Sequence, residues 1–303
     1  MIATVTLNPA VDHTIRLNEP LEGGTVQRTR EARFDAGGKG INVSKYLGGL
    51  EVETLATGVS GGFLGEFITD RLESEGIVHE FVGIDDHVRL NTTILAEAEY
   101  KINHAGPTLD AATIGEIIAV LDAYDPRTVV VAGSLPPGLG AASVDRIARE
   151  GTWETVADLG GEILDGLDAD YALCAPNRAE LAAATGMDTG TIEACRAATL
   201  ALRESSFERV LTSLGADGAV LATGEETYRA SALDAEVVDT VGAGDSLLAG
   251  VLATRLRGAS DERALAAGVT VASRVVSVPG TTVPSFENVE RDAERVPVTI
   301  VRA

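Results

Sequence analysis

Short apolar runs rich in β-branched residues alternate with amphipathic helical patterns along most of this chain. Continuous apolar runs indicate strands buried on both faces, and the helices between them supply the crossovers that parallel strands need. The sequence therefore predicts an α/β fold: a doubly wound, mostly parallel sheet with helices on both faces. The expected strands are residues 2–7, 53–59, 128–132, 155–157, 172–174, 210–213 and 219–222, and the expected helices include 62–75, 111–123, 141–150, 191–204, 246–257 and 261–278.

Two polar stretches break this rhythm. Residues 13–34 are extended and turn at Gly23 and Gly24, and residues 90–104 alternate in polarity and turn near 97–99. Both are typical of antiparallel strands with one exposed face. We expect a single domain spanning residues 1–303, with a small β-lid formed by insertions of about 13–35 and 88–106 over the carboxyl ends of the main strands.

The net charge of −22 limits the classes of partner. Acidic residues are spread along the chain, and only three of the 24 basic residues are lysines: Lys39, Lys45 and Lys101. A polyanion would be repelled, so nucleic acid is not an expected partner. Dense carboxylates are explained by a high-salt cytoplasm, where screening removes self-repulsion, and the alternative is an ordinary acidic protein.

The expected location is a reducing cytoplasm. Cys174 and Cys195 give neither a disulfide framework nor metal-ligand spacing. The opening segment lacks the pattern of a signal peptide, and no apolar stretch approaches the length of a membrane span.

Residues 239–246 read DTVGAGDS and precede a helical apolar pattern. Small residues at a helix N-terminus let free backbone N–H groups approach an anion, and the helix dipole favours negative charge there. Asp245 places a carboxylate beside that site. Phosphoryl transfer needs both parts: donors for the charge on the moving group and a base for the hydroxyl proton. The alternative is a carboxylate that caps a helix after a glycine turn.

Residues 36–43 read AGGKGINV. The two glycines permit close approach of the backbone to a polar ligand, and Asn42 can donate and accept the hydrogen bonds that sugar hydroxyls require. The segment is not a Walker A loop, because the chain has no G-x-x-x-x-G-K-[ST]. By itself it is equally typical of a plain glycine turn.

Together, the two segments resemble the paired signatures of the carbohydrate kinase family that includes ribokinase, adenosine kinase and the minor phosphofructokinases. The resemblance covers the chain from end to end and implies the same α/β fold with a β-lid. It also implies an ATP-dependent kinase in which Asp245 is the catalytic base. The implied anion hole is Gly242, Ala243 and Gly244.

Two further segments resemble the branch that contains 1-phosphofructokinase and tagatose-6-phosphate kinase: TLNPAVD at residues 6–12 and GSLPPG at residues 133–138. The resemblance implies that Asp12 binds sugar hydroxyls and that the phosphate of a sugar phosphate lies against Lys39 and Arg89. Conversion of fructose 1-phosphate to fructose 1,6-bisphosphate is the leading expectation. Alternatives are tagatose 6-phosphate or fructose 6-phosphate as acceptor, or a silent sugar or nucleotide sensor. The implied substrate residues are Asp12, Gly37, Gly38, Lys39, Asn42, Arg89, Asn91 and Ser134.

Asn177 and Glu180 match the family's N-x-x-E, which implies a Mg²⁺ ligand at Glu180, although a carboxylate at this spacing is more often a solvated helix face. Residues 213–218 read SLGADG and resemble the turn that contacts the nucleotide; they are also compatible with a simple hairpin turn. The implied nucleotide-binding residues are Asn177, Ser213, Gly215, Gly218 and Thr240.

Three departures from the family pattern affect these expectations. Thr93 stands where relatives often have a lysine, for which Lys101 on the next lid strand is a candidate substitute, and Ala175 replaces another common lysine. Asp239 stands where this branch usually has serine. In ribokinase-like relatives an aspartate there accompanies a monovalent-cation site, which implies K⁺. Exposed apolar faces on lid strands also suggest a homodimer formed through the lid.

Overall fold

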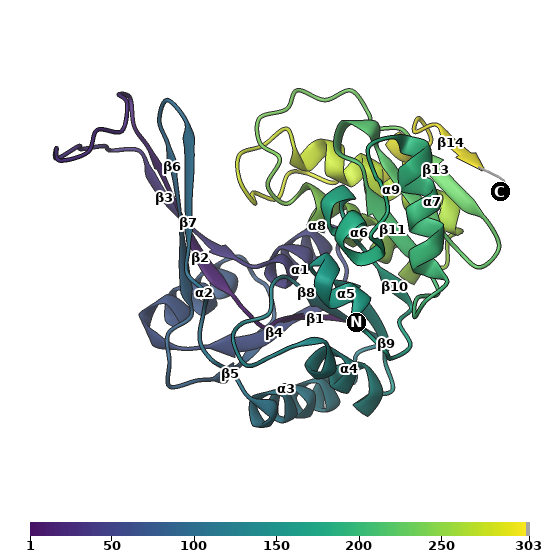
Figure 1. The fold of residues 1–303 in the computed structure, drawn as a ribbon, viewed down its shortest axis with the longest axis horizontal. Coiled ribbons are helices and arrows are strands. Elements are labelled where there is room, and N and C mark those ends of the chain that lie inside the picture. Colours follow the sequence, from purple (N-terminus) through teal and green to yellow (C-terminus); the bar gives the residue numbers. More distant parts are fainter. Residues whose placement is uncertain (301–303) are drawn as a thin grey trace.

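The computed structural model describes residues 1–300, and a ten-stranded sheet forms its centre (Figure 1). Seven neighbouring strands run parallel, and the last three turn antiparallel at one edge. In spatial order the strands are β14 (Val298–Ile300), β13 (Thr227–Ala230), β12 (Ala219–Ala222), β11 (Val210–Ser213), β10 (Leu173–Cys174), β9 (Glu154–Asp158), β8 (Thr128–Ala132), β1 (Ile2–Thr6), β4 (Thr54–Ser60) and β5 (His79–Gly83).

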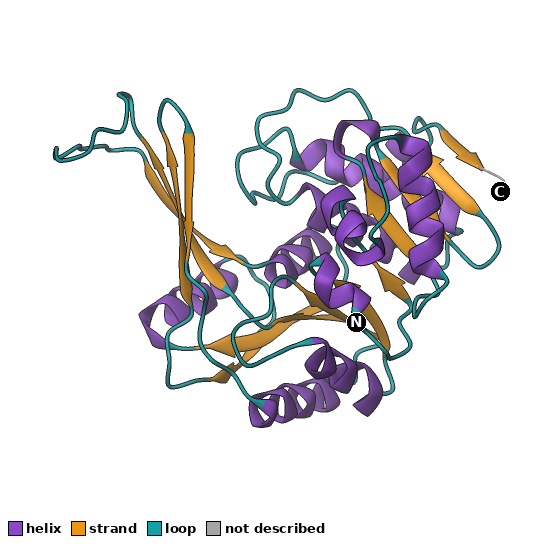
Figure 2. Cartoon of the chain, viewed as in Figure 1, coloured by secondary structure: helices purple, strands orange, loops and turns teal. Residues whose placement is uncertain are grey.

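Helices cover both faces of this sheet (Figure 2). Strand β8 shows why, because Val129 and Val131 pack into one apolar cluster while Val130 packs into the other. One face carries α1 (Lys39–Gly49), α8 (Ala243–Leu256), α9 (Asp261–Val275) and α10 (Val289–Ala293), with α2 (Gly62–Ser74) beside α1; the other carries α3 (Ala111–Tyr124), α4 (Ala141–Glu150), α5 (Gly161–Asp165), α6 (Arg178–Thr185) and α7 (Ile192–Arg203). The predicted fold class is confirmed.

A separate four-stranded sheet stands away from the main sheet and forms the lid (Figure 1). Its order is β3 (Ala32–Gly37), β2 (Ala10–Arg16), β6 (Arg89–Leu95) and β7 (Glu99–Asn103). Strands β2 and β6 pair in parallel, and the other pairs are antiparallel. The register aligns Asp12 with Asn91, so one lid face carries polar side chains at its base.

Several element boundaries differ from those expected from the sequence. The first lid strand begins at Ala10 and not near residue 13, and helix α8 begins at Ala243 and not at Ser246. The earlier helix start depends on Gly242, which adopts φ 77° and so turns the chain into the helix in a conformation that favours glycine. The edge strands β13 and β14 were not expected, because neither shows a long apolar run.

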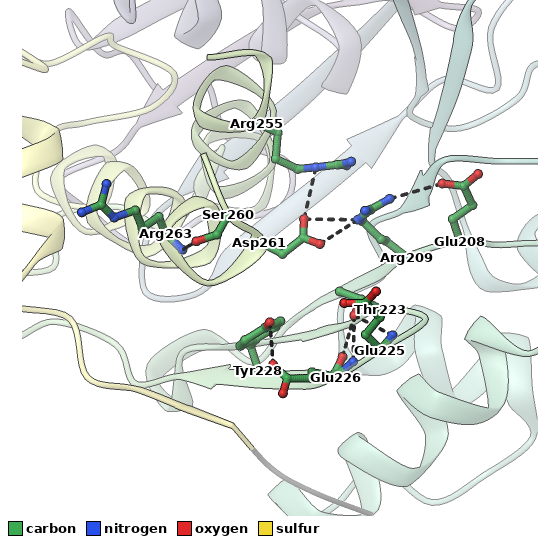
Figure 3. A network of polar contacts seen from close by, with 10 residues as sticks. All are labelled: Glu208, Arg209, Thr223, Glu225, Glu226, Tyr228, Arg255, Ser260, Asp261 and Arg263. Carbon is green, nitrogen blue, oxygen red and sulfur yellow. Dashed lines mark hydrogen bonds and ion pairs between the residues drawn. The ribbon is translucent and has the colours of Figure 1, made fainter. Parts of the chain in front are cut away.

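Charged networks tie the ends of elements together on this acidic protein. Figure 3 shows Asp261, at the start of α9, bound by both Arg209 and Arg255. The Asp261 carboxylate lies 3.0 Å from Arg209 Nε and 3.2 Å from Arg255 Nε. This arrangement joins the end of α8 and the chain before β11 to the N-terminus of α9, where a carboxylate is also favoured by the helix dipole.

Asp145 is a buried carboxylate that holds several donors of the fold. It accepts hydrogen bonds from the Tyr171 hydroxyl at 2.7 Å and from the backbone N–H groups of Asp168 and Ala169 at 3.1 and 3.0 Å. Asp145→Ala leaves these buried donors without an acceptor, so we expect the free energy of unfolding to fall by about 3–5 kcal/mol. Urea unfolding measures it, with the exposed Asp122→Ala as control; equal stabilities for the two variants would contradict the assignment.

Candidate active site

A cavity of about 180 Å³ lies at the carboxyl ends of the central parallel strands, where α/β sheets bind ligands. It is lined by Lys39, Asp158, Ala175, Asn177, Glu180, Leu211, Ser213, Thr240, Gly242, Ala243, Gly244, Asp245 and Leu247. A larger hollow of about 480 Å³ lies at the other end of α1 and α8. There the Arg257 guanidinium is already bonded to the Leu50 carbonyl, so we assign the chemistry to the smaller cavity.

Asp245 occupies the first turn of α8 and is 6% exposed. Asn42 on α1 donates from Nδ2 to Asp245 Oδ2 at 2.8 Å and fixes the carboxylate. Burial, reinforced by repulsion from Asp158, raises the pKa of Asp245 to about 7, against the opposing effects of Asn42 and Lys39. A carboxylate with such a pKa is a competent proton acceptor near neutral pH.

The turn before Asp245 presents backbone donors. Residues Ala243–Asp245 form the first turn of α8, whose N–H groups have no partner within the helix. The Ala243 N–H makes a long contact of 3.3 Å with the Thr240 carbonyl, and Ser246 begins the helical ladder on Gly242. A side chain at Gly242 would overlap the Tyr46 hydroxyl. The turn can therefore receive negative charge on its cavity side.

Lys39 lies between two carboxylates inside the cavity. Its Nζ is 2.7 Å from Asp158 Oδ1 and 3.1 Å from Glu180 Oε1. Burial alone opposes the charged form, but the two carboxylates outweigh that effect and raise the pKa of the ammonium group. The structure thus places Lys39 beside Glu180 and Asp158, on the side of the cavity that Asn177 and Ser213 line.

Most of the expected sugar-binding residues lie at the base of the lid, whereas Lys39 and Asn42 contact residues of the cavity. Asn91 Nδ2 donates to Asp12 Oδ1 at 2.9 Å, and a side chain at Gly37 would overlap the Asp12 carboxylate. Burial raises the pKa of Asp12, and Asn91 and Arg89 oppose that shift. Arg89 Nε donates to the Asn8 carbonyl at 3.2 Å, and Asn8 Nδ2 lies 3.2 Å from Ser134 Oγ.

Comparison with known proteins shows the family of this chain. The model of the pfkB family of carbohydrate kinases matches residues 5–288. The chain belongs to the pfkB family of carbohydrate kinases. It is 53% identical to 1-phosphofructokinase of Haloferax volcanii, over 100% of this chain and 99% of the relative. It is 33% identical to 1-phosphofructokinase of Bacillus subtilis, over 90% of this chain and 91% of the relative. Tagatose-6-phosphate kinase of Staphylococcus epidermidis is 31% identical over 88% of each chain.

Solved structures of the family share the fold. Phosphofructokinase-2 of Escherichia coli in complex with potassium superposes with a TM-score of 0.87 at 25% identity, covering 97% of this chain and 98% of that one. Ribokinase of Arabidopsis thaliana complexed with ribose and ATP has a TM-score of 0.74 at 23% identity, covering 97% of each chain, and shows the fold alone.

The expected nucleotide residues of this kinase divide into two groups. Asn177, Ser213 and Thr240 line the cavity, together with Glu180. Asn177 caps α6 by accepting from the N–H groups of Ala179 and Glu180, so this N-x-x-E also forms a capping box. Gly215 and Gly218 lie outside the cavity lining, in the 3₁₀ turn Gly215–Asp217 and its C-cap between β11 and β12.

A magnesium ion would find two carboxylates here. Within residues 1–300 no group of three histidine, cysteine, aspartate or glutamate side chains is placed to hold a metal. Glu180 and Asp158 flank the cavity, and Mg²⁺ in phosphoryl-transfer enzymes commonly takes one or two carboxylates together with substrate phosphates and water. The residues present therefore fit a metal that arrives with the nucleotide.

Two residues of the site were missed by sequence reasoning. Asp158 ends strand β9, and the only available signal was an acidic residue at the carboxyl end of a buried strand. Asn8 lies within the TLNPAVD segment, in which the family resemblance pointed to Asp12. Its connection to both Ser134 and the Ala105 carbonyl depends on residues about 100 or more positions away.

Proposed function

We propose that this kinase transfers the γ-phosphoryl group of ATP to the 6-hydroxyl of fructose 1-phosphate and forms fructose 1,6-bisphosphate. The observation that carries the proposal is the buried Asp245 carboxylate beside the backbone amides that begin α8 and have no partner within the helix. The 53% identity to a 1-phosphofructokinase over the whole chain supports this acceptor.

In the proposed reaction, Asp245 accepts the proton of the sugar hydroxyl while the oxygen of that hydroxyl attacks the γ-phosphorus. The bond from that phosphorus to the β,γ-bridging oxygen breaks, and ADP leaves with the bond electrons. The amides of Gly242, Ala243 and Gly244 receive the charge that develops on the phosphoryl oxygens. Asn42 holds the carboxylate in position through its 2.8 Å hydrogen bond.

The sugar phosphate lies against the lid in this proposal. Asp12, Asn91 and the backbone of Gly37 and Gly38 orient the sugar, with Ser134 from the loop after β8. Arg89 anchors the existing phosphate, because its guanidinium is partly buried and its Nε donates to the Asn8 carbonyl, which holds the group at the base of the lid. Lys39 lies with Asp158 and Glu180, so we assign it to the transferring phosphoryl group and not to the sugar's own phosphate. Lys101 pairs with Glu99 on an exposed lid strand and is left out of the site.

The nucleotide is proposed to lie over Asn177, Ser213 and Thr240, with Gly215 and Gly218 shaping the adjoining turn. Mg²⁺ would be held by Glu180 together with the nucleotide phosphates, and it would neutralise charge on the β- and γ-oxygens. Residues 1–303 act as one catalytic domain with its lid.

A substrate panel tests the acceptor. ADP release is measured with MgATP and each of fructose 1-phosphate, fructose 6-phosphate, tagatose 6-phosphate and ribose. We expect the highest kcat/KM with fructose 1-phosphate. A higher value for tagatose 6-phosphate or fructose 6-phosphate would replace the proposed acceptor, and no turnover with any sugar would favour a binding protein.

K⁺ is proposed as an activator that binds beside Asp239. This carboxylate already accepts the Val241 N–H at 3.0 Å and the Gly280 N–H at 2.9 Å, so it joins the loop before the anion hole to the segment after α9. The related phosphofructokinase-2 of Escherichia coli is known in complex with potassium. We expect kcat to rise when K⁺ replaces tetramethylammonium at constant ionic strength. Equal rates in the two salts would exclude activation.

A homodimer through the lid is proposed from the apolar lid face. The register places Phe34 beside His13, and Thr92 beside Ile102, on the face opposite Asp12. Phe34 is 46% exposed and Ile102 is 58% exposed. A second copy of this face would cover such side chains. Light scattering at working salt should give twice the chain mass, and a monomer would remove the proposal.

The composition supports a high-salt, reducing cytoplasm as the setting. The net charge is −22, and Cys174 and Cys195 are unpaired and buried. No helix within residues 1–300 has the length and apolarity of a membrane span. We expect thermal stability to rise with KCl concentration as surface repulsion is screened. Maximal stability in dilute buffer would contradict this setting.

A further inference from the structure

The Tyr46 side chain is a buried polar group that the reaction described so far does not use. Tyr46 lies on α1 and is 0% exposed. Across residues 1–300, its hydroxyl has no hydrogen-bond partner. A buried hydroxyl without a partner costs free energy, and phenylalanine would fill nearly the same space without that cost. A structural role in core packing therefore does not explain the oxygen.

The hydroxyl is aimed at the turn that precedes Asp245. It lies so close to Gly242 that a β-carbon on this residue would overlap it. Gly242 lines the cavity and Tyr46 is buried outside that lining, so Tyr46 lies on the interior side of the turn. Burial raises the pKa of the Tyr46 hydroxyl, with further contributions from Asp245 and Asp239, so it remains a neutral donor.

Helix α1 lies beside α8 (Figure 1) and contacts its start through two residues. Asn42 donates to Asp245, and Tyr46, one helical turn later on the same face of α1, lies against Gly242. The first contact fixes the base. The second contact lies beneath the amides that receive the phosphoryl group.

We infer that Tyr46 is a positioning residue of the phosphoryl-transfer centre: its ring supports the glycine turn, and its hydroxyl donates to the main chain of that turn when phosphate binds. The hydroxyl has no partner in the structure, and the hydrogen bond that we propose for it adds to the binding of the phosphates. This inference rests on the phosphoryl transfer proposed above but not on which sugar is the acceptor.

Tyr46→Phe tests the inference, and Tyr171→Phe is its matched control. Tyr171 is also buried, at 1% exposed, but its hydroxyl is already bonded to Asp145 at 2.7 Å, and Tyr171 does not line the cavity. For Tyr46→Phe we expect kcat to fall about tenfold with the KM for the sugar changed less than about twofold, because the amides are misplaced in the transition state. Its melting temperature without ligand should equal or exceed that of the wild type.

Nucleotide binding gives a second measurement that needs no sugar. The rise in melting temperature produced by MgADP should be smaller for Tyr46→Phe than for the wild type. Tyr171→Phe should have a lower melting temperature than the wild type without ligand, but the same rise with MgADP and the same kcat. An unchanged kcat together with an unchanged MgADP effect in Tyr46→Phe would overturn the inference. So would a loss of melting temperature like that of Tyr171→Phe, since it would show that the hydroxyl is bonded in the unliganded protein. If the wild type itself gave no turnover, the proposed function would fail. The MgADP comparison would still test the role of Tyr46 in binding the phosphates.

Discussion

Replacing Asp245 with asparagine is expected to lower kcat about 10³–10⁴-fold while leaving the affinity for the sugar phosphate nearly unchanged, because the variant loses the proton acceptor but keeps the shape of the site. The Asn42 hydrogen bond survives, since the new amide oxygen can take the place of Oδ2. Steady-state kinetics and calorimetric binding of the sugar phosphate measure the two quantities. Asp234→Asn, in the exposed loop before the turn, serves as control.

The same variant should be more stable than the wild type at neutral pH. The pKa of Asp245 is raised to about 7 in the folded protein, from 3.8, mainly by burial, so the folded state holds a proton that the unfolded state has lost. Stability of the wild type therefore falls as pH rises from about 4 to about 7, because the unfolded state binds fewer protons over that range. Asp245→Asn removes this loss, and we expect a gain of about 1–3 kcal/mol above pH 7.

Urea unfolding at pH 5 and pH 8 measures this difference. The stability gain of Asp245→Asn over wild type should be larger at pH 8 than at pH 5. A wild-type-like kcat would end the assignment of Asp245 as base, and a gain that did not depend on pH would show that its carboxylate is not held protonated in the folded protein.

Replacing Lys39 with methionine should separate two possible roles of this lysine. If Lys39 acts on the transferring phosphoryl group, Lys39→Met lowers kcat by about 10²–10³-fold, as loss of one preorganised donor does, and changes the KM for the sugar phosphate little. Its ion pairs with Asp158 and Glu180 support this role. The variant also leaves Asp158, which is 3% exposed, without its cation, so kinetics should be measured at a temperature where circular dichroism shows it folded.

Arg89→Met is the matched comparison for Lys39→Met. It should raise the KM for the sugar phosphate about 10–100-fold, the usual effect of losing hydrogen bonds to a charged group, with a smaller effect on kcat. If Lys39→Met instead raised this KM as Arg89→Met does, Lys39 would belong to the sugar's phosphate, as the sequence pattern first indicated.

Much of the fold followed from the sequence, because strand and helix patterns depend on neighbouring residues. The runs at 128–132, 210–213 and 219–222 match β8, β11 and β12, since buried strands must be continuously apolar. The helix after Asp245 was expected from its apolar spacing, but its start was placed three residues late. The helix starts at Ala243 because Gly242 adopts the left-handed conformation there, and a side chain at Gly242 would overlap Tyr46 of α1.

The local motifs of the site were also visible in the sequence, because each is a short segment whose residues act together. Asp245 with its glycine turn, and Asn177 with Glu180, are placed by the helices that they begin. The sequence by itself therefore determined the fold class and the kinase family, and it indicated the segments that we propose carry the chemistry.

The tertiary structure decided which of these segments meet. It brought Lys39 to Asp158 and Glu180, 119 and 141 residues away, and it placed Asn42 on Asp245 across 203 residues. It also set Tyr46 beneath Gly242 and raised the pKa of Asp245. The physical reason is that burial and electrostatic interaction depend on distances in space, which the packing of α1 against α8 and the order of the strands fix, and not on distance along the chain.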